Sequence, residues 1–378
     1  MEFTVHNQVL SAVFVLSLVL GAVMAKTSFC TMGAVSDWVN IGDTGRMRAW
    51  VFSMAVAVAG VAALEAAGVF NLSGVTFPPY RTGNFAWVRN LLGGFLFGVG
   101  MVLASGCGTK TLVRVGGGNF KSLTVLVIAA ISVYAMTWTP FYEKLFLPWI
   151  APTTVNLGQY GVANQEAGTL IGGMFGFGYS REFNLAIAAL IALGMLAFVF
   201  RSADFRGSFD NILGGAVVGL AVVGGWYITA GPLGQAWTEY ALMAQEMPSR
   251  AQAQSYTFMN PMGDTVRYLM EPTRLLLVNF GILALAGVVV GSFLYAVFSR
   301  SLRFEWFSSW QDFRSHAAGG LLIGIGGPLA GGCTVGQAIT GVSTLAIGSI
   351  LTFFAIVIGA AATMKFMYWR ITREADLA

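Results

Sequence analysis

Residues 93–110 read GGFLFGVGMVLASGCGTK, and residues 319–336 read GGLLIGIGGPLAGGCTVG. When the first segment is moved along the chain by 226 residues, identical residues coincide: Gly94, Gly98, Gly100, Leu103, Ala104, Gly106 and Cys107 fall on Gly320, Gly324, Gly326, Leu329, Ala330, Gly332 and Cys333. Each copy is an apolar run that ends in a cysteine set among glycines. The match indicates an internal duplication.

The composition is that of a polytopic membrane protein. Of the 378 residues, 56% are hydrophobic and 10% are charged, whereas soluble domains carry about 25% charged residues. The formal net charge of +4 falls mainly on short loops and on the C-terminal tail. It therefore bears on orientation in a membrane and gives no support for nucleic-acid binding. The lipid bilayer is the first partner that we expect.

Apolar stretches long enough to cross a membrane recur along the chain. We place long spans at residues 8–25, 47–69, 121–139, 183–200, 210–230, 273–298 and 344–368, and shorter apolar pieces at 91–106, 166–179 and 317–332. A 16-residue helix rises about 24 Å, too little to cross about 30 Å of hydrocarbon comfortably, so short pieces are expected where helices break inside the membrane. The predicted fold is an all-α polytopic membrane protein with about nine transmembrane helices and additional half-membrane helices.

Loop charges predict the orientation of these helices. Basic residues concentrate in the tail, in the loop at 299–316, in the linker at 201–206 and in the turn after Cys107. The positive-inside rule places these segments in the cytoplasm, and the C-terminus with them. The first copy of the repeat then starts outside the membrane, and the second copy starts inside.

Inverted copies predict a chain built as two pseudo-symmetric halves, as in many transporters. We expect a single integral membrane transport domain over residues 1–378. Its first half is about 1–182 and contains Cys30 and Cys107, and its second half is about 183–378 and contains Cys333.

The glycine-rich corners suit a bound anion. Glycine accepts positive φ and lets other groups approach closely, and glycines flank the cysteines at Gly106, Gly108 and Gly332. If a half-helix begins just after each cysteine, its free N–H groups and positive dipole end face the break and cradle an anion. The hydroxyl donors expected beside the corners are those of Thr109, Thr111 and Thr334. The alternative is that glycine-rich helices only pack closely and that the cysteines are small apolar residues.

Cys30 is the third cysteine, and it follows the first span in a polar stretch. Three cysteines without CxxC spacing argue against a disulfide framework and a zinc site, and we predict no metal ligands and no catalytic residues. Soft thiol sulfur interacts well with other sulfur, and a neutral S–H is a weak donor. Three thiols together with backbone amides therefore favour a sulfur-bearing oxyanion over sulfate or phosphate.

Three blocks of the chain carry a family resemblance. SFCTMGAVSDW at residues 28–38, GGFLFGVGMVLASGCGTKTLVR at 93–114 and GGLLIGIGGPLAGGCTVG at 319–336 resemble the YeeE/YedE sulfur-transport family, and the likeness covers nearly the whole chain. It implies an hourglass of long and half-length helices that takes up thiosulfate across the inner (cytoplasmic) membrane, without enzyme activity or cofactor. The residues that it implies along the path are Cys30, Cys107 and Cys333, supported by Gly106, Gly108, Thr109, Gly332 and Thr334.

The first corner departs from the family pattern, because it reads SGC where members more often show GGC and adds Lys110. Lys110 either attracts the anion or extends toward cytoplasmic headgroups, and the headgroups are our preferred interpretation. The resemblance also suggests a cytoplasmic sulfur-carrier protein of the TusA type as a partner.

Other functions stay open at this point. The substrate could be another sulfur or selenium compound. The chain could be a membrane sulfurtransferase that forms a cysteine persulfide, or a membrane scaffold in which the cysteines only pack. Glu65, near the end of the second span, is either a proton-coupling carboxylate or an interfacial residue. No nucleotide-binding loop is evident, which argues against ATP-driven pumping by this chain.

Overall fold

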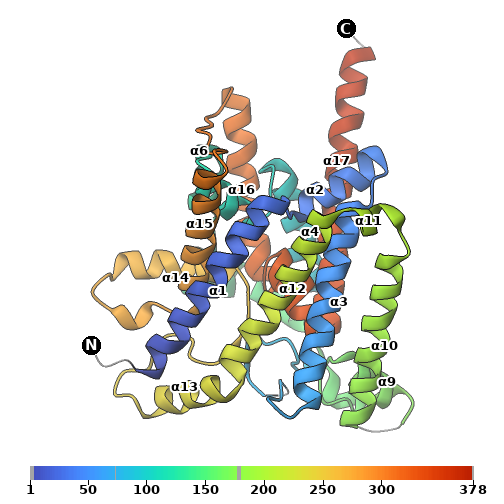
Figure 1. The fold of residues 1–378 in the computed structure, drawn as a ribbon, viewed down its shortest axis with the longest axis vertical. Coiled ribbons are helices and arrows are strands. Elements are labelled where there is room, and N and C mark those ends of the chain that lie inside the picture. The colour runs from blue at the N-terminus through green and yellow to red at the C-terminus, as the bar shows by residue number, and fades with distance from the viewer. Residues whose placement is uncertain (1–3, 73, 177–179, 377–378) are drawn as a thin grey trace.

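The computed structural model describes residues 4–72, 74–176 and 180–376, most of which are helical (Figure 1). Nine segments of this part of the chain are long and apolar enough to cross a membrane: Val5–Ile41, Gly45–Ala66, Trp87–Gly116, Phe120–Trp138, Arg181–Phe200, Phe209–Ala230, Phe280–Phe298, Trp310–Gly341 and Ile347–Arg373. Each predicted long span overlaps one of them. The prediction of an all-α polytopic membrane protein is confirmed.

The long helices are α1 (Val5–Thr27), α3 (Gly45–Ala66), α4 (Trp87–Leu103), α6 (Phe120–Trp138), α10 (Arg181–Phe200), α12 (Phe209–Ala230), α15 (Phe280–Phe298), α16 (Trp310–Ala330) and α17 (Ile347–Asp376). Three shorter segments continue a long helix after a break in it. They are α2 (Thr31–Ser36) with the π-helix η1 (Asp37–Ile41), α5 (Gly108–Gly116), and the π-helix η5 (Val335–Gly341).

Loops on both sides carry the remaining elements, which are α7 (Phe141–Leu145), α8 (Leu147–Ile150), η2 (Ala151–Thr153), η3 (Leu157–Tyr160), α9 (Ala167–Met174), α11 (Ala203–Gly207), α13 (Pro232–Met243), α14 (Met259–Met270) and η4 (Leu275–Leu277). Two short strand pairs join distant loops. β1 (Thr76–Phe77) is parallel to β4 (Ala253–Gln254), and β2 (Asn84–Phe85) is antiparallel to β3 (Val155–Asn156).

The three predicted short pieces have different outcomes. The piece at 91–106 corresponds to α4, and the piece at 166–179 to the eight-residue α9, although 177–179 lie outside the described residues. The piece at 317–332 is longer than predicted, because α16 already starts at Trp310. Ser309 caps this start, since its hydroxyl accepts a hydrogen bond from the amide of Asp312 at 3.1 Å. The polar residues of the first two turns are therefore helical.

The two copies of the repeat, α4 and α16, pack against each other in opposite directions. A Cβ added to Gly93 would lie 2.3 Å from the nitrogen of Ala330, and one added to Gly319 would lie 2.5 Å from the nitrogen of Ala104. A shift of 226 residues turns the first of these contacts into the second. Gly319 is the equivalent of Gly93, and Ala104 is the equivalent of Ala330, so the same contact is made twice across the interface. Such an interface has two-fold symmetry.

The other long helices repeat this relationship. α17 packs on α4 as α6 packs on α16, and α1 packs on α15 as α12 packs on α3. The helices up to α6 thus find counterparts among the helices from α12 onward. α10 packs on the outside of α3, between the two sets in sequence. These pairings support the proposal of two inverted halves.

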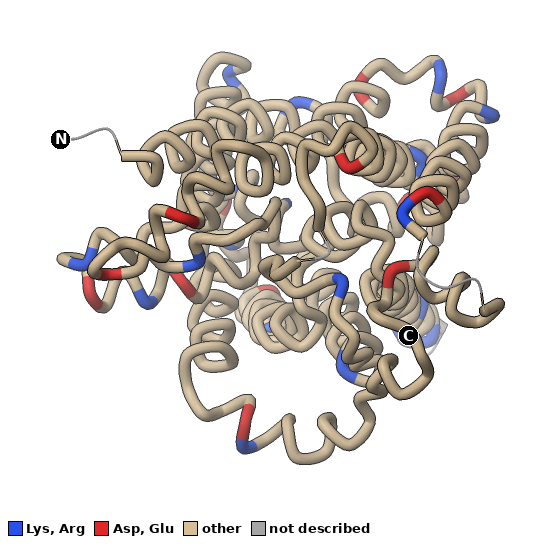
Figure 2. The backbone as a smooth tube through the Cα atoms, turned by 90° about the horizontal axis from the view of Figure 1, so that it is seen from below, with Lys and Arg blue, Asp and Glu red and all other residues tan. Residues whose placement is uncertain are grey.

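The outside of the helix bundle is apolar. Exposed side chains on the long helices include Val15, Leu190, Leu193, Phe354 and Ile358, as expected for residues that face lipid. Figure 2 shows that the charged positions lie mainly on loops and helix ends. The polar breaks of α1, α4 and α16 therefore lie inside a shell of apolar helices.

Candidate functional site

All three cysteines follow the same backbone turn. A residue in the left-handed region lies two positions before each of them: Ser28 at φ 49°, Ser105 at φ 55° and Gly331 at φ 76°. The sequence had suggested positive φ at the glycines beside the cysteines, but Gly106 and Gly332 do not have it. The chain instead turns one residue earlier, at the position that ends the preceding helix.

The hydrogen bonds of the two duplicated corners are also the same. The amide of Gly106 donates to the carbonyl of Met101 at 2.9 Å, and the amide of Gly332 donates to that of Gly327 at 2.9 Å. This bond, with a left-handed residue inside it, is the Schellman ending of an α-helix. The corner is therefore a defined structural unit made twice, with a cysteine directly after it.

Each cysteine then begins the next helical segment. Cys30 caps α2, where the amide of Gly33 donates to its Sγ at 3.5 Å. The amide of Gly336 donates to Sγ of Cys333 at 3.3 Å, and the amide of Lys110 occupies the same place beside Cys107. The free amides of three helix starts thus point at the breaks, as the sequence analysis expected.

The structure brings the three cysteines together. The thiols of Cys30 and Cys107 interact with each other, and Cys333 interacts electrostatically with Cys107. The hydroxyl of Thr334 contacts the thiol of Cys107. The exposed fractions are 7% for Cys30, 1% for Cys107 and 0% for Cys333. Three residues from distant parts of the sequence therefore form one buried cluster, which we call the thiol cluster.

Threonine hydroxyls beside the thiol cluster lack a hydrogen bond of good geometry. Within the described residues, these are the buried hydroxyls of Thr31, Thr109, Thr257 and Thr334. An unsatisfied buried hydroxyl costs about 1–3 kcal/mol, so each calls for an explanation such as a bound ligand. Thr111 differs, because its hydroxyl donates to the carbonyl of Cys107 at 3.0 Å.

The glycines beside the cysteines contribute space to different degrees. A Cβ on Gly108 would lie 3.0 Å from Sδ of Met259, which is tight, whereas one on Gly106 would make ordinary contacts at 3.5 Å. A Cβ on Gly332 would lie 3.4 Å from the hydroxyl of Thr257. Gly108 therefore keeps room at the thiol cluster, whereas Gly106 and Gly332 mainly complete the helix endings.

A polar cavity of about 210 Å³ opens beside the Gly331 corner. Its polar lining includes Arg89, Asn90, Gln165, Asn260, Gln337 and Ser349. Among these, Arg89 carries the charge, and its buried Nε has no hydrogen-bond partner within the described residues. A terminal nitrogen of Arg89 lies 3.6 Å from where a Cβ of Gly331 would be. The cavity therefore presents a cation next to the turn that leads to Cys333.

Cations also lie on the other side of the thiol cluster. Lys110 interacts electrostatically with Cys30 and Cys107, and with Arg46 and Arg114. Lys110 is thus close to the thiols, which supports attraction of an anion over our preferred interpretation that it only reaches headgroups. Positive charge accordingly lies near Cys30 and Cys107, at Lys110, and beside the turn that leads to Cys333, at Arg89.

The second half of the chain has a phenylalanine at the position that is equivalent to Cys30, so the four corners carry three cysteines. α2 packs on α3 and α17, and α14 packs on the equivalent helices α15 and α6. α14 is therefore the counterpart of α2, and Phe258 is the residue that precedes it. Phe258 contributes its backbone amide, which donates to Cys333. The fourth corner thus supports the cluster through its backbone.

Glu65 is part of a buried ion pair. At the end of α3, its two carboxylate oxygens accept hydrogen bonds from the two terminal nitrogens of Arg81 at 2.8 and 3.0 Å. The Glu65 side chain is 13% exposed. It therefore does not face an open interface, and its charge is balanced within the protein.

Sequence reasoning had missed Arg89, Thr31 and Thr257. Thr31 adjoins a predicted site cysteine, so its position was a usable signal. Arg89, in the first turn of α4, and Thr257, in the loop before α14, lie far from any cysteine in the sequence, and only the packing of the chain brings them to the site.

Buried helix breaks, unsatisfied hydroxyls and flanking cations within an apolar bundle define the class of membrane transporters for small anions. The chain belongs to the sulphur-transport family, whose profile matches residues 26–362. This is the family to which the three cysteine blocks pointed.

Two relatives are similar over almost their full length. The thiosulfate transporter TsuA of Escherichia coli (strain K12) is 25% identical over 369 residues, which is 95% of this chain and 95% of that protein. The thiosulfate transporter TsuA of Spirochaeta thermophila is 24% identical over 365 residues, with 90% and 93% covered. The chain is thus similar to transporters along both of its halves and is itself a membrane transporter.

Proposed function

We propose that this protein takes up thiosulfate across the inner membrane through the thiol cluster. The observation that carries the proposal is the meeting of Cys30, Cys107 and Cys333 beside buried threonine hydroxyls that lack a hydrogen bond of good geometry within the described residues. The names of the two relatives support the same substrate.

The chemistry of thiosulfate matches this arrangement. The dianion has one terminal sulfur and three oxygens. Its soft sulfur can meet the thiols through weak S–H···S contacts, and its oxygens can accept from the hydroxyls of Thr109 and Thr334 and from backbone amides. Because these donors carry no full charge, the anion is held weakly enough to move on. Sulfate offers oxygen alone and would gain less from the thiols.

The order of the contacts defines a route. The anion is collected beside Arg89, passes to Cys333 and then to Cys107, and leaves by Cys30 toward Lys110. Arg89 lies beside Gly331, two residues before Cys333, and each later step joins residues that interact in the structure. Under the positive-inside rule the Arg89 cavity faces outward and Lys110 faces the cytoplasm.

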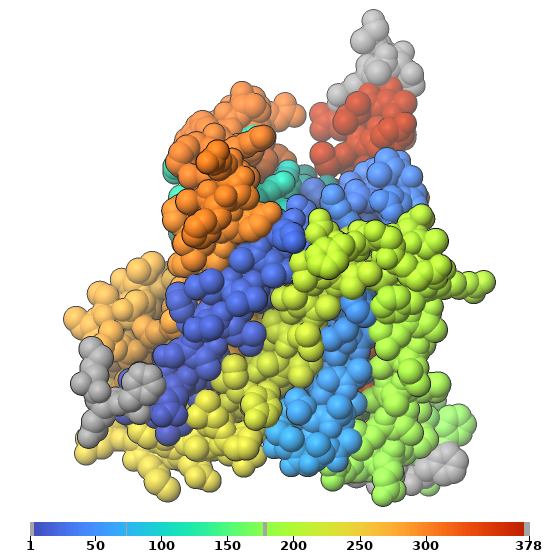
Figure 3. Space-filling view, in the orientation of Figure 1, coloured from blue at the N-terminus to red at the C-terminus, as the bar shows by residue number. Residues whose placement is uncertain are grey.

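The cytoplasmic side offers room for a partner. In our orientation this side carries the C-terminus and the loop at 299–316. Figure 3 shows a hollow between the end of α17 and that loop. We propose that a sulfur-carrier protein of the TusA type docks there and receives the anion.

Uptake of a dianion needs a driving force. Moving one charge through 100 mV is worth about 2.3 kcal/mol, so a dianion that enters a cell with a negative interior pays about 4.6 kcal/mol per 100 mV. Consumption of thiosulfate inside the cell or coupling to cations must supply this energy.

Growth of a sulfur-starved host tests the proposal. A strain without other thiosulfate uptake is supplied with thiosulfate, sulfate or sulfite, with and without this chain. We expect the chain to restore growth on thiosulfate only. Equal growth with and without the chain on thiosulfate contradicts the proposal, and rescue on a selenium source instead supports the alternative substrate.

Single replacements of the three cysteines by alanine test the route. We expect each variant to fold and to lose most thiosulfate uptake. Unchanged uptake in all three variants would remove the thiols from the path. A persulfide on a cysteine, detected by mass spectrometry during turnover, would favour the sulfurtransferase alternative.

A further inference from the structure

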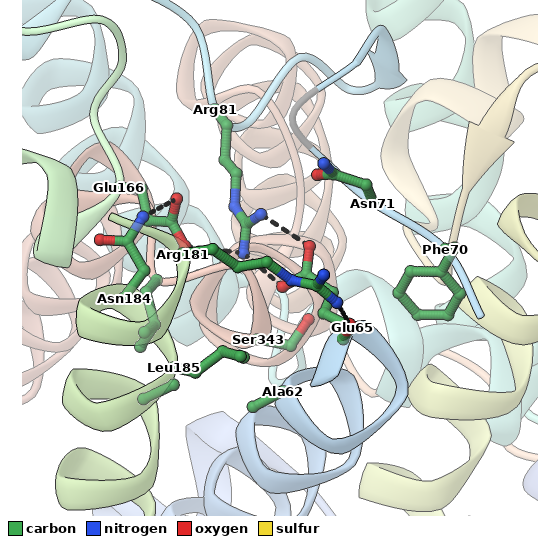
Figure 4. Close-up of a pocket in the computed structure, with 12 residues that line it drawn as sticks. Ala62, Glu65, Phe70, Asn71, Arg81, Glu166, Arg181, Asn184, Leu185 and Ser343 are labelled. Carbon is green, nitrogen blue, oxygen red and sulfur yellow. Dashed lines mark hydrogen bonds and ion pairs between the residues drawn. The ribbon is translucent and has the colours of Figure 1, made fainter. Parts of the chain in front are cut away.

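A second carboxylate joins the Glu65–Arg81 pair from another part of the chain. An oxygen of Glu166, which precedes α9, lies 3.0 Å from a terminal nitrogen of Arg81. Its other oxygen accepts from the side-chain amide of Asn184 at 3.0 Å. Figure 4 shows these groups around a small cavity, of about 30 Å³. One guanidinium therefore holds two buried carboxylates.

This environment favours the protonated form of Glu166. Burial raises the pKa of its carboxyl and outweighs the opposing effect of Arg81, and the negative charge of Glu65 raises the pKa further. The remaining charged group at the cavity is Arg181 of α10, whose guanidinium donates to the backbone carbonyl of Glu65. Both carboxylates thus contact Arg81, and the raised pKa of Glu166 favours its protonated form.

The same arginine holds the segment that follows Cys333. Nε of Arg81 donates to the carbonyl of Thr344 at 3.0 Å, and the neighbouring Tyr80 donates its hydroxyl to the carbonyl of Gly336 at 2.7 Å. These two bonds hold the first turn of η5 and a residue three positions after its end. A π-helix is a rare element that frequently occurs at functional sites. The amide of Gly336 in η5 donates to Sγ of Cys333, so the bonds from Tyr80 and Arg81 connect the ion pair to the thiol cluster.

The carboxylate segment itself touches the same stretch of chain. The amide of Ala167, next to Glu166, donates to the carbonyl of Leu345 at 3.0 Å. The side-chain oxygen of Gln165 accepts from the amide of Gly348 at 3.1 Å. Any shift of Glu166 on changing its charge is therefore passed directly to residues 344–348, which follow the π-helix.

We propose that Glu166 is a proton-binding site that controls access to Cys333. A proton from the water at the outer face binds the carboxylate and converts it to the neutral acid. The ion pair between Glu166 and Arg81 is then lost, and Glu65 is the carboxylate that still pairs with Arg81. The hydrogen bonds that hold η5 and the residues after it become weaker. The identity of the transported substrate in this inference rests on the proposed function. A lower external pH then increases uptake of that substrate.

Thiosulfate uptake at different external pH values tests the proposal, with three proteins compared. The wild type should gain about tenfold in rate when the external pH falls across the titration of one group. E166Q mimics the protonated acid and should transport rapidly with no pH response. E182Q is the matched control, since Glu182 is an exposed carboxylate on α10, and it should respond like the wild type.

A full pH response in E166Q, or none in the wild type while thiosulfate still enters, overturns the inference and leaves the proposed function standing. Infrared titration of the purified protein in membranes decides the case if thiosulfate is not transported at all. We expect a protonated-carboxyl band that is present in the wild type and in E182Q and missing in E166Q. Identical bands in all three proteins overturn the inference.

Discussion

Ser105 and Gly331 occupy the same left-handed turn, at φ 55° and 76°, two residues before Cys107 and Cys333. One copy of the duplication thus places a serine where the other has glycine. A non-glycine residue in this region carries a steric cost of about 1–2 kcal/mol. The first corner therefore keeps a strained turn that the second corner avoids.

The two turns make opposite predictions for substitution. Ser105→Gly should stabilise the protein by about 1 kcal/mol, because glycine removes the steric cost. Gly331→Ala should destabilise it by more, since its Cβ would also lie 2.9 Å from the side-chain nitrogen of Gln337. Thermal unfolding of the purified variants in detergent measures both changes. If both substitutions changed the stability in the same direction, the two turns would not be equivalent.

The contact between α4 and α16 depends on glycine. Gly93→Ala should destabilise the fold by several kcal/mol, because the new Cβ would lie 2.3 Å from backbone of α16, which cannot move aside easily. Gly194→Ala in α10 is the control. No atom lies within 4 Å of its added Cβ, and alanine favours a helix by about 1 kcal/mol, so this variant should be slightly more stable. Unfolding in detergent and the yield of folded protein distinguish the two results.

The duplication and the loop charges together predicted two inverted halves. The direct packing of α4 on α16 through the repeated glycines was not predicted, and it supports that arrangement. The meeting of the three cysteines did not follow from their positions, which only put Cys30, Cys107 and Cys333 on separate elements of the chain. The family resemblance alone implied that they line one path. The partner groups could not be predicted in the same way. Arg89 lies in the first turn of α4 and meets Gly331 only because α4 packs on α16. Glu166 meets Arg81 through long loops, whose course depends on packing and leaves no periodic pattern in the sequence.

The strained turn at Ser105 was hidden for a different reason. A sequence-based prediction places positive φ at glycine, and the glycines beside Cys107 are Gly106 and Gly108. The helix ending, however, requires the left-handed residue at a fixed place after the last helical carbonyls. That geometry overrides the preference of the individual residue.

The threonine hydroxyls near Cys107 give a paired test of substrate contact. Thr109→Val should lower uptake by about tenfold, the effect of losing about 1.4 kcal/mol of interaction with the anion. Stability should stay the same or rise, because a hydroxyl without a partner is removed. Thr111→Val is matched in shape and removes a hydroxyl that is bonded to the carbonyl of Cys107. It should cost about 1 kcal/mol of stability and leave uptake nearly intact.

Arg89 should govern capture of the anion. We expect Arg89→Gln to raise the KM for thiosulfate about tenfold or more while changing the maximal rate much less, because the loss affects binding at the mouth and not passage of the thiol cluster. The wild type should lose affinity as salt is added, since salt screens this attraction, and the variant should lose less. An unchanged KM in the variant would remove Arg89 from the route.

Glu166 should make the stability of the fold depend on pH. Its pKa is raised above the ordinary value of 4.5, chiefly by burial, so the folded state binds the proton more tightly than the unfolded state does. Stability from this group is complete below 4.5 and is lost as the pH rises through the folded-state pKa. We expect the unfolding temperature of the wild type to fall over this window relative to that of Glu166→Gln, which binds no proton there. Glu182→Gln should follow the wild type, and a parallel pH curve for Glu166→Gln would mean that another group titrates.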